Sequence, residues 1–139
     1  MAVVAGDFDA FTSEELFDEF TNPEKLVIWW PETAEVDLRV GGRFALCWPT
    51  NNWNLRGEYL AVSAGEHLAF TWSWDHEPSR PPQRVDVWFD CVHEQGTRIG
   101  IYHGPFQDTE EAREARQGVI EGWIHFCMRL GGVAPGKVD

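Results

Sequence analysis

The middle of the chain alternates between apolar and polar residues with a period of two, which predicts a series of β-strands. A first hairpin is expected from 34–40 and 43–48, because Val36, Leu38 and Val40 alternate with polar residues and the Gly41-Gly42 pair can reverse the chain. A first strand is expected over 3–11. Four further strands are predicted at 56–62, 68–74, 85–92 and 97–103, the last two joined by a turn at 94–96.

Helical periodicity and capping residues predict three helices around these strands. Thr12 and Glu15 form the pattern of a capping box at the start of a short helix. A second short helix is expected to begin at Asn22-Pro23 and to end before Pro31. A long helix is predicted over 108–130, capped by Asp108 and ended by Gly131-Gly132. Its apolar stripe consists of Ala112, Ala115, Val119, Trp123, Phe126 and Leu130.

This order of elements predicts an α+β fold of the helix-grip type. The expected architecture is a curved antiparallel sheet of about six or seven strands, with two short helices and one long C-terminal helix packed across it. A curved sheet cannot bury its concave face alone, and the last helix is the element long enough to cover it. We expect one domain over 1–133 and a flexible tail over 134–139.

Composition narrows the classes of function. The 139 residues carry a formal net charge of −12, which disfavours binding to nucleic acids and to anionic membranes. No apolar run is long enough to span a bilayer, and no signal peptide is visible. The scattered Cys47, Cys91 and Cys127 fit free thiols in a reducing cytoplasm. Cys91 and His93 lack a third ligand, so no metal is expected, and no nucleotide-binding motif suggests a cofactor.

Several motifs, in order and spacing, resemble the activator of heat-shock-protein ATPase homologue family, within the START/Bet v-like helix-grip (SRPBCC) superfamily. They are 11–17, 21–24, 29–31, 37–44, 57–60, 68–72, 96–98, His103 and 122–123. The resemblance implies a helix-grip fold with an internal cavity for an apolar ligand, and it implies no single activity. Chaperone-activating members carry an additional domain, so the resemblance does not extend to that activity.

Two residues are candidates for acid–base chemistry. His103 is in phase with Ile99 and Ile101, so its imidazole is expected on the concave side, where it either polarises a ligand carbonyl or makes a structural hydrogen bond. Glu58 is in phase with Leu60 and Val62. A carboxylate on an apolar face needs a partner, which Arg39 or Arg43 could supply, so Glu58 is either one half of an ion pair or a catalytic acid.

Eight tryptophans and nine phenylalanines suggest an interior lined with rings, which either bind a flat ligand or fill the space themselves. The expected ligand-binding residues are Trp29, Trp30, Trp48, Phe70, Trp72, Trp74, Ile101, His103 and Trp123. The leading hypothesis is a cytosolic protein that holds a small apolar or aromatic molecule between sheet and helix. The alternatives are a polyketide cyclase or aromatase-like enzyme using His103 or Glu58, and a protein-interaction module. A homodimer is also expected, either through the helix flank of Ile120, Ile124 and Met128 or through the edge of the sheet.

Overall fold

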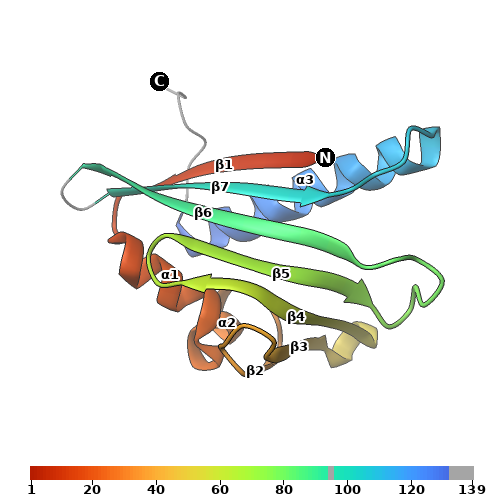
Figure 1. Ribbon diagram of the computed structural model, residues 1–139, viewed down its shortest axis with the longest axis horizontal. Coiled ribbons are helices and arrows are strands. Elements are labelled where there is room, and N and C mark those ends of the chain that lie inside the picture. Colours follow the sequence, from red (N-terminus) through yellow and green to blue (C-terminus); the bar gives the residue numbers. More distant parts are fainter. Residues whose placement is uncertain (94–95, 132–139) are drawn as a thin grey trace.

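Seven antiparallel strands form one curved sheet in the order β1-β7-β6-β5-β4-β3-β2, and three helices lie on its concave side (Figure 1). The computed structural model describes residues 1–93 and 96–131. The strands are β1 (Ala2–Phe8), β2 (Thr33–Val36), β3 (Arg43–Trp48), β4 (Trp53–Ser63), β5 (His67–Trp74), β6 (Gln83–His93) and β7 (Gly96–Gly104). The helices are α1 (Ser13–Thr21), α2 (Pro23–Trp29) and α3 (Glu110–Leu130), with a 3-10 turn, η1 (Pro49–Asn51). This architecture confirms the predicted helix-grip class.

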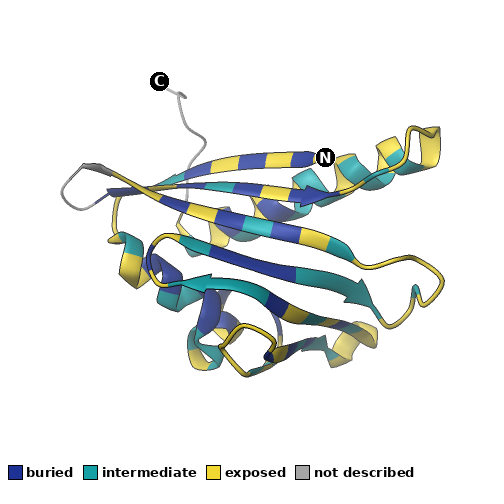
Figure 2. Ribbon diagram, in the orientation of Figure 1, coloured by how far each residue is buried: buried dark blue, intermediate teal, exposed yellow. Residues whose placement is uncertain are grey.

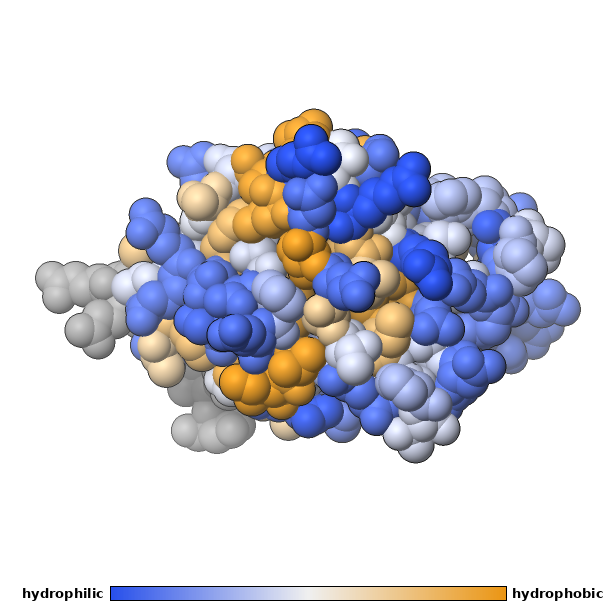
Figure 3. All heavy atoms as spheres, turned by 90° about the horizontal axis from the view of Figure 1, so that it is seen from below, coloured by the Kyte–Doolittle hydropathy of each residue, from blue (hydrophilic) through white to orange (hydrophobic). Residues whose placement is uncertain are grey.

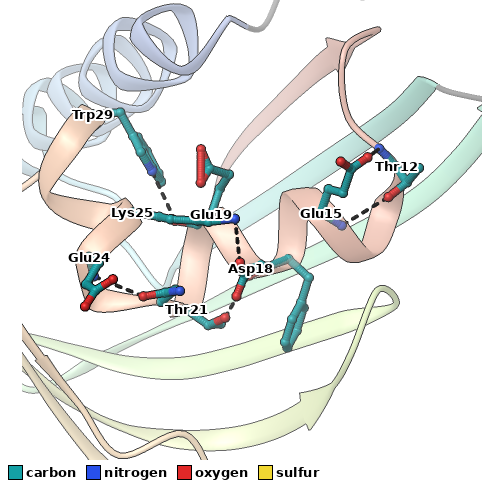
Figure 4. Close-up of polar contacts among 10 residues, drawn as sticks. Thr12, Glu15, Asp18, Glu19, Thr21, Glu24, Lys25 and Trp29 are labelled. Atoms are coloured by element: carbon teal, nitrogen blue, oxygen red, sulfur yellow. Dashed lines mark hydrogen bonds and ion pairs between the residues drawn. The ribbon is translucent and has the colours of Figure 1, made fainter.

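The two short helices begin where their capping residues predict (Figure 4). The Thr12 hydroxyl accepts a hydrogen bond from the Glu15 amide at 3.1 Å, and the Glu15 carboxylate accepts one from the Thr12 amide at 2.9 Å. These reciprocal bonds satisfy two amides that the first turn of a helix leaves unpaired. The Asn22 side chain caps α2 in the same manner by accepting from the Glu24 amide at 3.0 Å.

Contacts between α1 and α2 fix the position of the C-terminal end of α2. Lys25 pairs with Asp18 at 2.7 Å, and the Trp29 indole donates to the Glu19 carbonyl at 3.1 Å (Figure 4). Trp29 and the C-capping residue Trp30 are both buried, with 1% and 8% of their surface exposed. The end of α2 therefore delivers two adjacent indole rings to the core.

Alternate residues of the strands face the core, and Figure 2 shows this as alternating bands along β1, β6 and β7. In Figure 1, α3 runs behind β1, β7 and β6, whereas α1 and α2 lie at one end of the sheet. Only Trp123 and Cys127 of α3 are fully buried, and both lie in its second half. The first half of α3 therefore lies on the protein with little burial.

The predicted strand 34–40 is wrong beyond Val36. Leu38 and Val40 are 40% and 66% exposed and belong to a loop. The backbone on either side of the turn pairs with β4 instead, since Gly41 donates to the Tyr59 carbonyl and the Tyr59 amide donates to the Gly42 carbonyl, both at 2.8 Å. This pairing draws the loop toward β4. The first strand also ends earlier than predicted, at Phe8.

The prediction that Glu58, Leu60 and Val62 share a buried face is also wrong. The register between β4 and β5 shifts between Tyr59 and Ala61, as in a β-bulge. Before the shift the odd-numbered residues face the core, so Tyr59 is 3% exposed and Glu58 lies on the outer face. After it, Val62 packs against the core. One extra residue therefore reverses which side chains point inward.

The long helix begins one residue later than predicted. Thr109, rather than Asp108, is the N-cap, and its hydroxyl accepts from the Ala112 amide at 3.1 Å. Asp108 instead pairs with Arg113 at 2.8 Å. At the other end, Gly131 has a φ of 105° and terminates the helix as predicted.

The predicted apolar flank of this helix, Ile120, Ile124 and Met128, differs in burial along its length. Ile120 packs against the core, whereas Ile124 and Met128 are 45% and 65% exposed. No helix in the described part of the chain is both long and apolar enough to span a membrane. The predicted turn residues Glu94 and Gln95, the residue Gly132 and the predicted tail 134–139 lie outside the described residues.

Candidate functional site

Five tryptophans from four separate parts of the chain form one cluster of touching rings, which we call the tryptophan wall. Its members are Trp30 at the end of α2, Trp48 at the end of β3, Trp72 and Trp74 on β5, and Trp123 on α3. Their ring centroids lie 5.1 to 6.1 Å apart in six pairs. The sequence predicted each of these residues for the ligand site, and the fold brings all five together.

Burial decreases along the wall from its interior to its outer end. Trp123 and Trp30 are buried, whereas Trp48, Trp72 and Trp74 are only partly buried. The exposed Trp53 continues the series, with its ring 6.0 Å from that of Trp74. Large aromatic rings left partly in contact with water are a costly feature for a purely structural core. The outer end of the wall is therefore in contact with solvent.

The remaining predicted apolar residues lie away from this accessible end. Trp29 stacks on Trp30, but it is nearly inaccessible. Ile101 is fully buried, and Phe70 packs edge-to-face against Phe44 with 5.3 Å between their centroids. Phe70 borders an internal void of about 10 Å³. That volume is about the space that one water molecule occupies, so side chains fill the interior near Phe70.

His103 is completely buried beneath the wall, and both of its ring nitrogens have partners. The Trp123 indole donates to Nδ1 at 3.1 Å, and Nε2 lies 2.8 Å from Oε1 of Gln83. An indole N–H can only donate, so Nδ1 carries no proton and Nε2–H donates to Gln83. Burial lowers the pKa of His103 to about 4. The imidazole is therefore neutral at pH 7.

These bonds continue to the loop after β7, where the Gln83 side chain donates to the Pro105 carbonyl at 2.9 Å. The chain of bonds links α3, the end of β7 and the start of β6. A general base needs a nitrogen within reach of the proton that it removes, and neither nitrogen of His103 is available. Gln83 was not among the residues predicted for the site. It precedes the predicted strand 85–92, whereas in the structure β6 already begins at Gln83.

Glu58 does not join His103 in an acid–base pair. It is exposed on the outer face of β4, and its register partner on β3 is Arg43. Arg39, the other predicted partner, binds Asp37 at 2.9 Å. Because His103 lies inside the fold and Glu58 outside it, no single substrate can contact both side chains.

The outer face of the sheet carries a second aromatic feature. Trp88 is 46% exposed, and its ring stacks on that of His67 with 3.6 Å between the centroids. His67 Nε2 lies 2.7 Å from the Asp86 carboxylate, which also binds Arg84. Burial raises the pKa of Asp86, but the bonds from Arg84 and His67 outweigh it and lower that pKa overall.

The described residues contain no group of three or more His, Cys, Asp or Glu side chains placed to hold a metal ion. The side chain of His93 lies outside the described residues. Cys127 is buried against the core, and burial raises the pKa of its thiol to about 12. At neutral pH this thiol is protonated and so a poor nucleophile.

Comparison with known proteins assigns this chain to a family. The sequence model described as "Activator of Hsp90 ATPase homolog 1-like protein" matches residues 10–134. The chain belongs to this family. A comparison with curated proteins found no significant match. The resemblance that the sequence motifs suggested is thus confirmed for nearly the whole length of the chain.

Solved structures share the fold of this chain at low sequence identity. Protein MLL2253 from Mesorhizobium loti is 24% identical with a TM-score of 0.77, and the match covers 92% of this chain and 93% of that one. An Hsp90 activator from Plasmodium falciparum is 22% identical, with a TM-score of 0.72 and coverage of 94% and 96%. DynU16, a putative protein in the dynemicin biosynthetic locus, is 15% identical, with a TM-score of 0.76. That match covers 94% of this chain and 46% of DynU16.

Proposed function

We propose that this protein binds a small apolar or aromatic molecule against the outer end of the tryptophan wall. The observation that carries the proposal is the partial exposure of three neighbouring rings, Trp48, Trp72 and Trp74, on top of the buried Trp30 and Trp123. Stacking on such rings favours flat ligands. Ligand sites are mostly apolar with few polar groups, as this wall is. DynU16, which shares the fold, is named for a biosynthetic locus, which agrees with a role in small-molecule metabolism.

The filled interior determines how such a ligand would bind. Sites for small molecules usually measure about 300–1,000 Å³, far more than the void of about 10 Å³ beneath the sheet. The ligand would therefore lie on the outer end of the wall, and deeper entry would require α3 to move. The first half of α3 has no fully buried residue, so its displacement exposes little apolar surface.

A titration of tryptophan fluorescence with a library of flat aromatic and polyketide compounds tests this proposal. Binding should quench the emission saturably, and Trp72→Ala should weaken the binding by about tenfold, equivalent to about 1.4 kcal/mol of lost stacking. Trp88→Ala is the matched control, because it removes an exposed indole from the outer face of the sheet. Equal losses in both variants, or no saturable response from the wild type, would contradict the proposal.

A role as a protein-interaction module is the second candidate, and a different surface favours it. Val27 and Ile28 on α2, and Leu38 and Val40 after β2, are 40%, 71%, 40% and 66% exposed. Figure 3 shows hydrophobic side chains gathered on this side of the molecule between polar ones. Contiguous exposed apolar surface is typical of protein contacts. If this candidate is right, the wild type should stimulate an Hsp90 ATPase and Ile28→Glu should abolish that stimulation.

A cytoplasmic location and a homodimer complete the proposal. Protonated, isolated thiols such as that of Cys127 fit a reducing compartment. The dimer would use the exposed Ile124 and Met128 of α3, since two-fold assemblies pair one patch with itself. Fractionation of cells tests the location, and recovery of the protein in a secreted or membrane fraction would contradict it.

A further inference from the structure

The outer face of the sheet carries a hollow that opens to solvent, which we call the outer hollow. It lies over β6, β7 and the start of β1, on the face turned to the viewer in Figure 1, whereas α3 runs behind these strands. Its volume is about 460 Å³, within the range of small-molecule sites. The residues that line it are Met1, Asp86, Trp88, Asp90 and Tyr102. A ligand can reach this hollow without any movement of α3.

One face of the Trp88 indole is covered, and the other is turned to the outer hollow. The His67 ring, on β5, lies parallel to the indole with an interplanar angle of 1° and 3.6 Å between the centroids. His67 is itself held by Asp86, whose carboxylate lies 2.7 Å from Nε2. Because β6 lies between β5 and β7, the uncovered face of the indole is directed toward β7, where Tyr102 also borders the hollow. The imidazole thus fixes the orientation of an indole that remains exposed.

A glycine leaves room beside this uncovered face. Gly100 is the cross-strand partner of Trp88 on β7, and it has no side chain to fill the space opposite the indole. The Tyr102 ring leans over this position, since a Cβ added to Gly100 would lie 3.2 Å from a ring carbon of Tyr102. Trp88 and Tyr102 thus stand on the two sides of a space with the Gly100 backbone between them. Such a space accepts a flat group.

The charged groups around the outer hollow leave one carboxylate for a ligand. Asp86 is already bound by Arg84 at 2.7 Å. Arg98, the cross-strand partner of Asp90, donates to both carboxylate oxygens of Asp7, at 2.7 and 3.2 Å. Within the described part of the chain, no hydrogen bond or ion pair engages the carboxylate of Asp90, which is exposed. The half of the hollow between Trp88 and Asp90 therefore combines an indole face with an available anion.

We infer that the outer hollow binds a small planar organic cation with N–H donors, an amidinium or guanidinium group, stacked on Trp88 and hydrogen-bonded to Asp90. The face of an indole attracts cations, and a flat, delocalised cation is weakly hydrated and stays in contact with the whole ring. A carboxylate accepts two parallel hydrogen bonds from such a group. Trp88 and Asp90 are two positions apart on one strand, about 6.7 Å, which one small cation can span.

Other classes of ligand fit this arrangement less well. An anion would face Asp86 and Asp90 and the net charge of −12. A metal ion needs several ligands at one point, but these two carboxylates are four positions apart on β6, about 13 Å. A neutral flat molecule could stack on Trp88 but would gain nothing from Asp90. The inference concerns a different site from the tryptophan wall and goes beyond the proposed function.

Three compounds that differ in one property each test the inference. Benzamidine is a planar cation with N–H donors, benzamide has the same ring with a neutral amide, and phenyltrimethylammonium is charged but has no N–H group. The protein is titrated with each compound, and two-dimensional ¹⁵N NMR follows the backbone amide and indole N–H resonances. This measurement locates a ligand even when its dissociation constant is in the millimolar range.

Two variants and two matched controls identify the site. Trp88→Ala removes the stacking face, and Trp53→Ala removes an indole of the same 46% exposure at the outer end of the tryptophan wall. Asp90→Asn removes the carboxylate charge, and Glu58→Gln removes the same charge from another position on the outer face of the sheet. All four side chains are exposed, so these changes should leave the fold intact.

Benzamidine should shift the resonances of the Trp88 indole and the Gly100 amide saturably. Trp88→Ala and Asp90→Asn should each weaken its binding by about 2- to 5-fold, the range of exposed cation–π contacts and exposed ion pairs. Both controls should bind benzamidine as the wild type does. Benzamide should bind about 5- to 25-fold more weakly than benzamidine, because it loses both interactions. Phenyltrimethylammonium should also bind more weakly, because it cannot donate to Asp90.

Four results would overturn the inference. They are the absence of a saturable shift at Trp88, binding of benzamide or phenyltrimethylammonium as tight as that of benzamidine, a loss in Trp53→Ala as large as in Trp88→Ala, and equal losses in Glu58→Gln and Asp90→Asn. The third result would place the cation on the tryptophan wall, and the fourth would indicate attraction to the acidic surface in general. None of them decides whether neutral ligands bind to the wall, so the proposed function is tested separately.

Discussion

Lowering the pH from 7 to 5 should destabilise this protein through His103. The folded state keeps the imidazole neutral with a pKa of about 4, because it is completely buried. The unfolded chain binds a proton at the ordinary value of 6.5. Protonation in the fold would also place a second N–H at Nδ1, facing the Trp123 indole N–H that this nitrogen now accepts. Between pH 6.5 and 4 the unfolded state therefore binds more protons than the folded state.

The size of the effect follows from that difference. Because the unfolded state binds the extra proton, stability is fully present above pH 6.5 and is lost progressively as the pH falls toward 4. A shift from 6.5 to about 4 corresponds to about 3 kcal/mol in total. At pH 5 most of it has already been lost, so the free energy of unfolding should be about 2 kcal/mol lower than at pH 7.

Urea unfolding at pH 7 and pH 5 measures this difference, with His103→Gln as the test variant. Glutamine does not titrate, so the variant should be less stable at pH 7 but should lose little further stability at pH 5. His125→Gln, an exposed position on α3, is the control and should retain the pH dependence of the wild type. The reasoning is refuted if the wild type and His103→Gln lose equal stability, or if NMR shows His103 titrating near pH 6.5.

Three further predictions concern the fold and the assembly. Gly57→Ala should destabilise the protein by about 1–3 kcal/mol in thermal unfolding, because an added Cβ would overlap the Phe44 ring, and a stable variant would contradict this packing. Thr109→Ala should cost about 1 kcal/mol and Asp108→Ala much less, and the reverse order in urea unfolding would restore Asp108 as the cap. Light scattering at micromolar concentration should give a dimer that Ile124→Glu converts to monomers; a monomeric wild type rejects the dimer.

The sequence predicted those elements whose signals are local. The capping box at Thr12 and Glu15, and the strand that places Phe70 and Trp72 on one face, depend on residues only two to four positions apart. The predictions from sequence were wrong where pairing with a distant strand determines the bounds of a strand or the face on which a residue lies. The bulge near Tyr59 comes from the register between β4 and β5. The loop after Val36 forms backbone hydrogen bonds with β4, although its own residues alternate between apolar and polar as in a strand. Such competition between pairing partners leaves no mark in a local pattern.

The same limit applies to the tryptophan wall. Strand periodicity correctly placed Trp72 and Trp74 on one face of β5, and helix periodicity placed Trp123 on the inner side of α3. How closely these rings approach each other depends on the path of α3 over the sheet, which no local pattern encodes. Whether the rings fill the interior or leave space therefore depends on packing between distant elements, and the hollow beside Trp30 and Phe70 measures about 10 Å³.

The hydrogen-bond partners of His103, rather than its residue type, determine whether it can act as a base. Its period on β7 correctly indicated a position on the concave side, where an imidazole is a natural candidate base. Its two partners, Gln83 and Trp123, each lie 20 positions away in the sequence. Together they occupy both nitrogens, and burial removes the charge. A residue type that suggests a general base is therefore held here as a neutral, fully hydrogen-bonded histidine that joins α3 to the sheet.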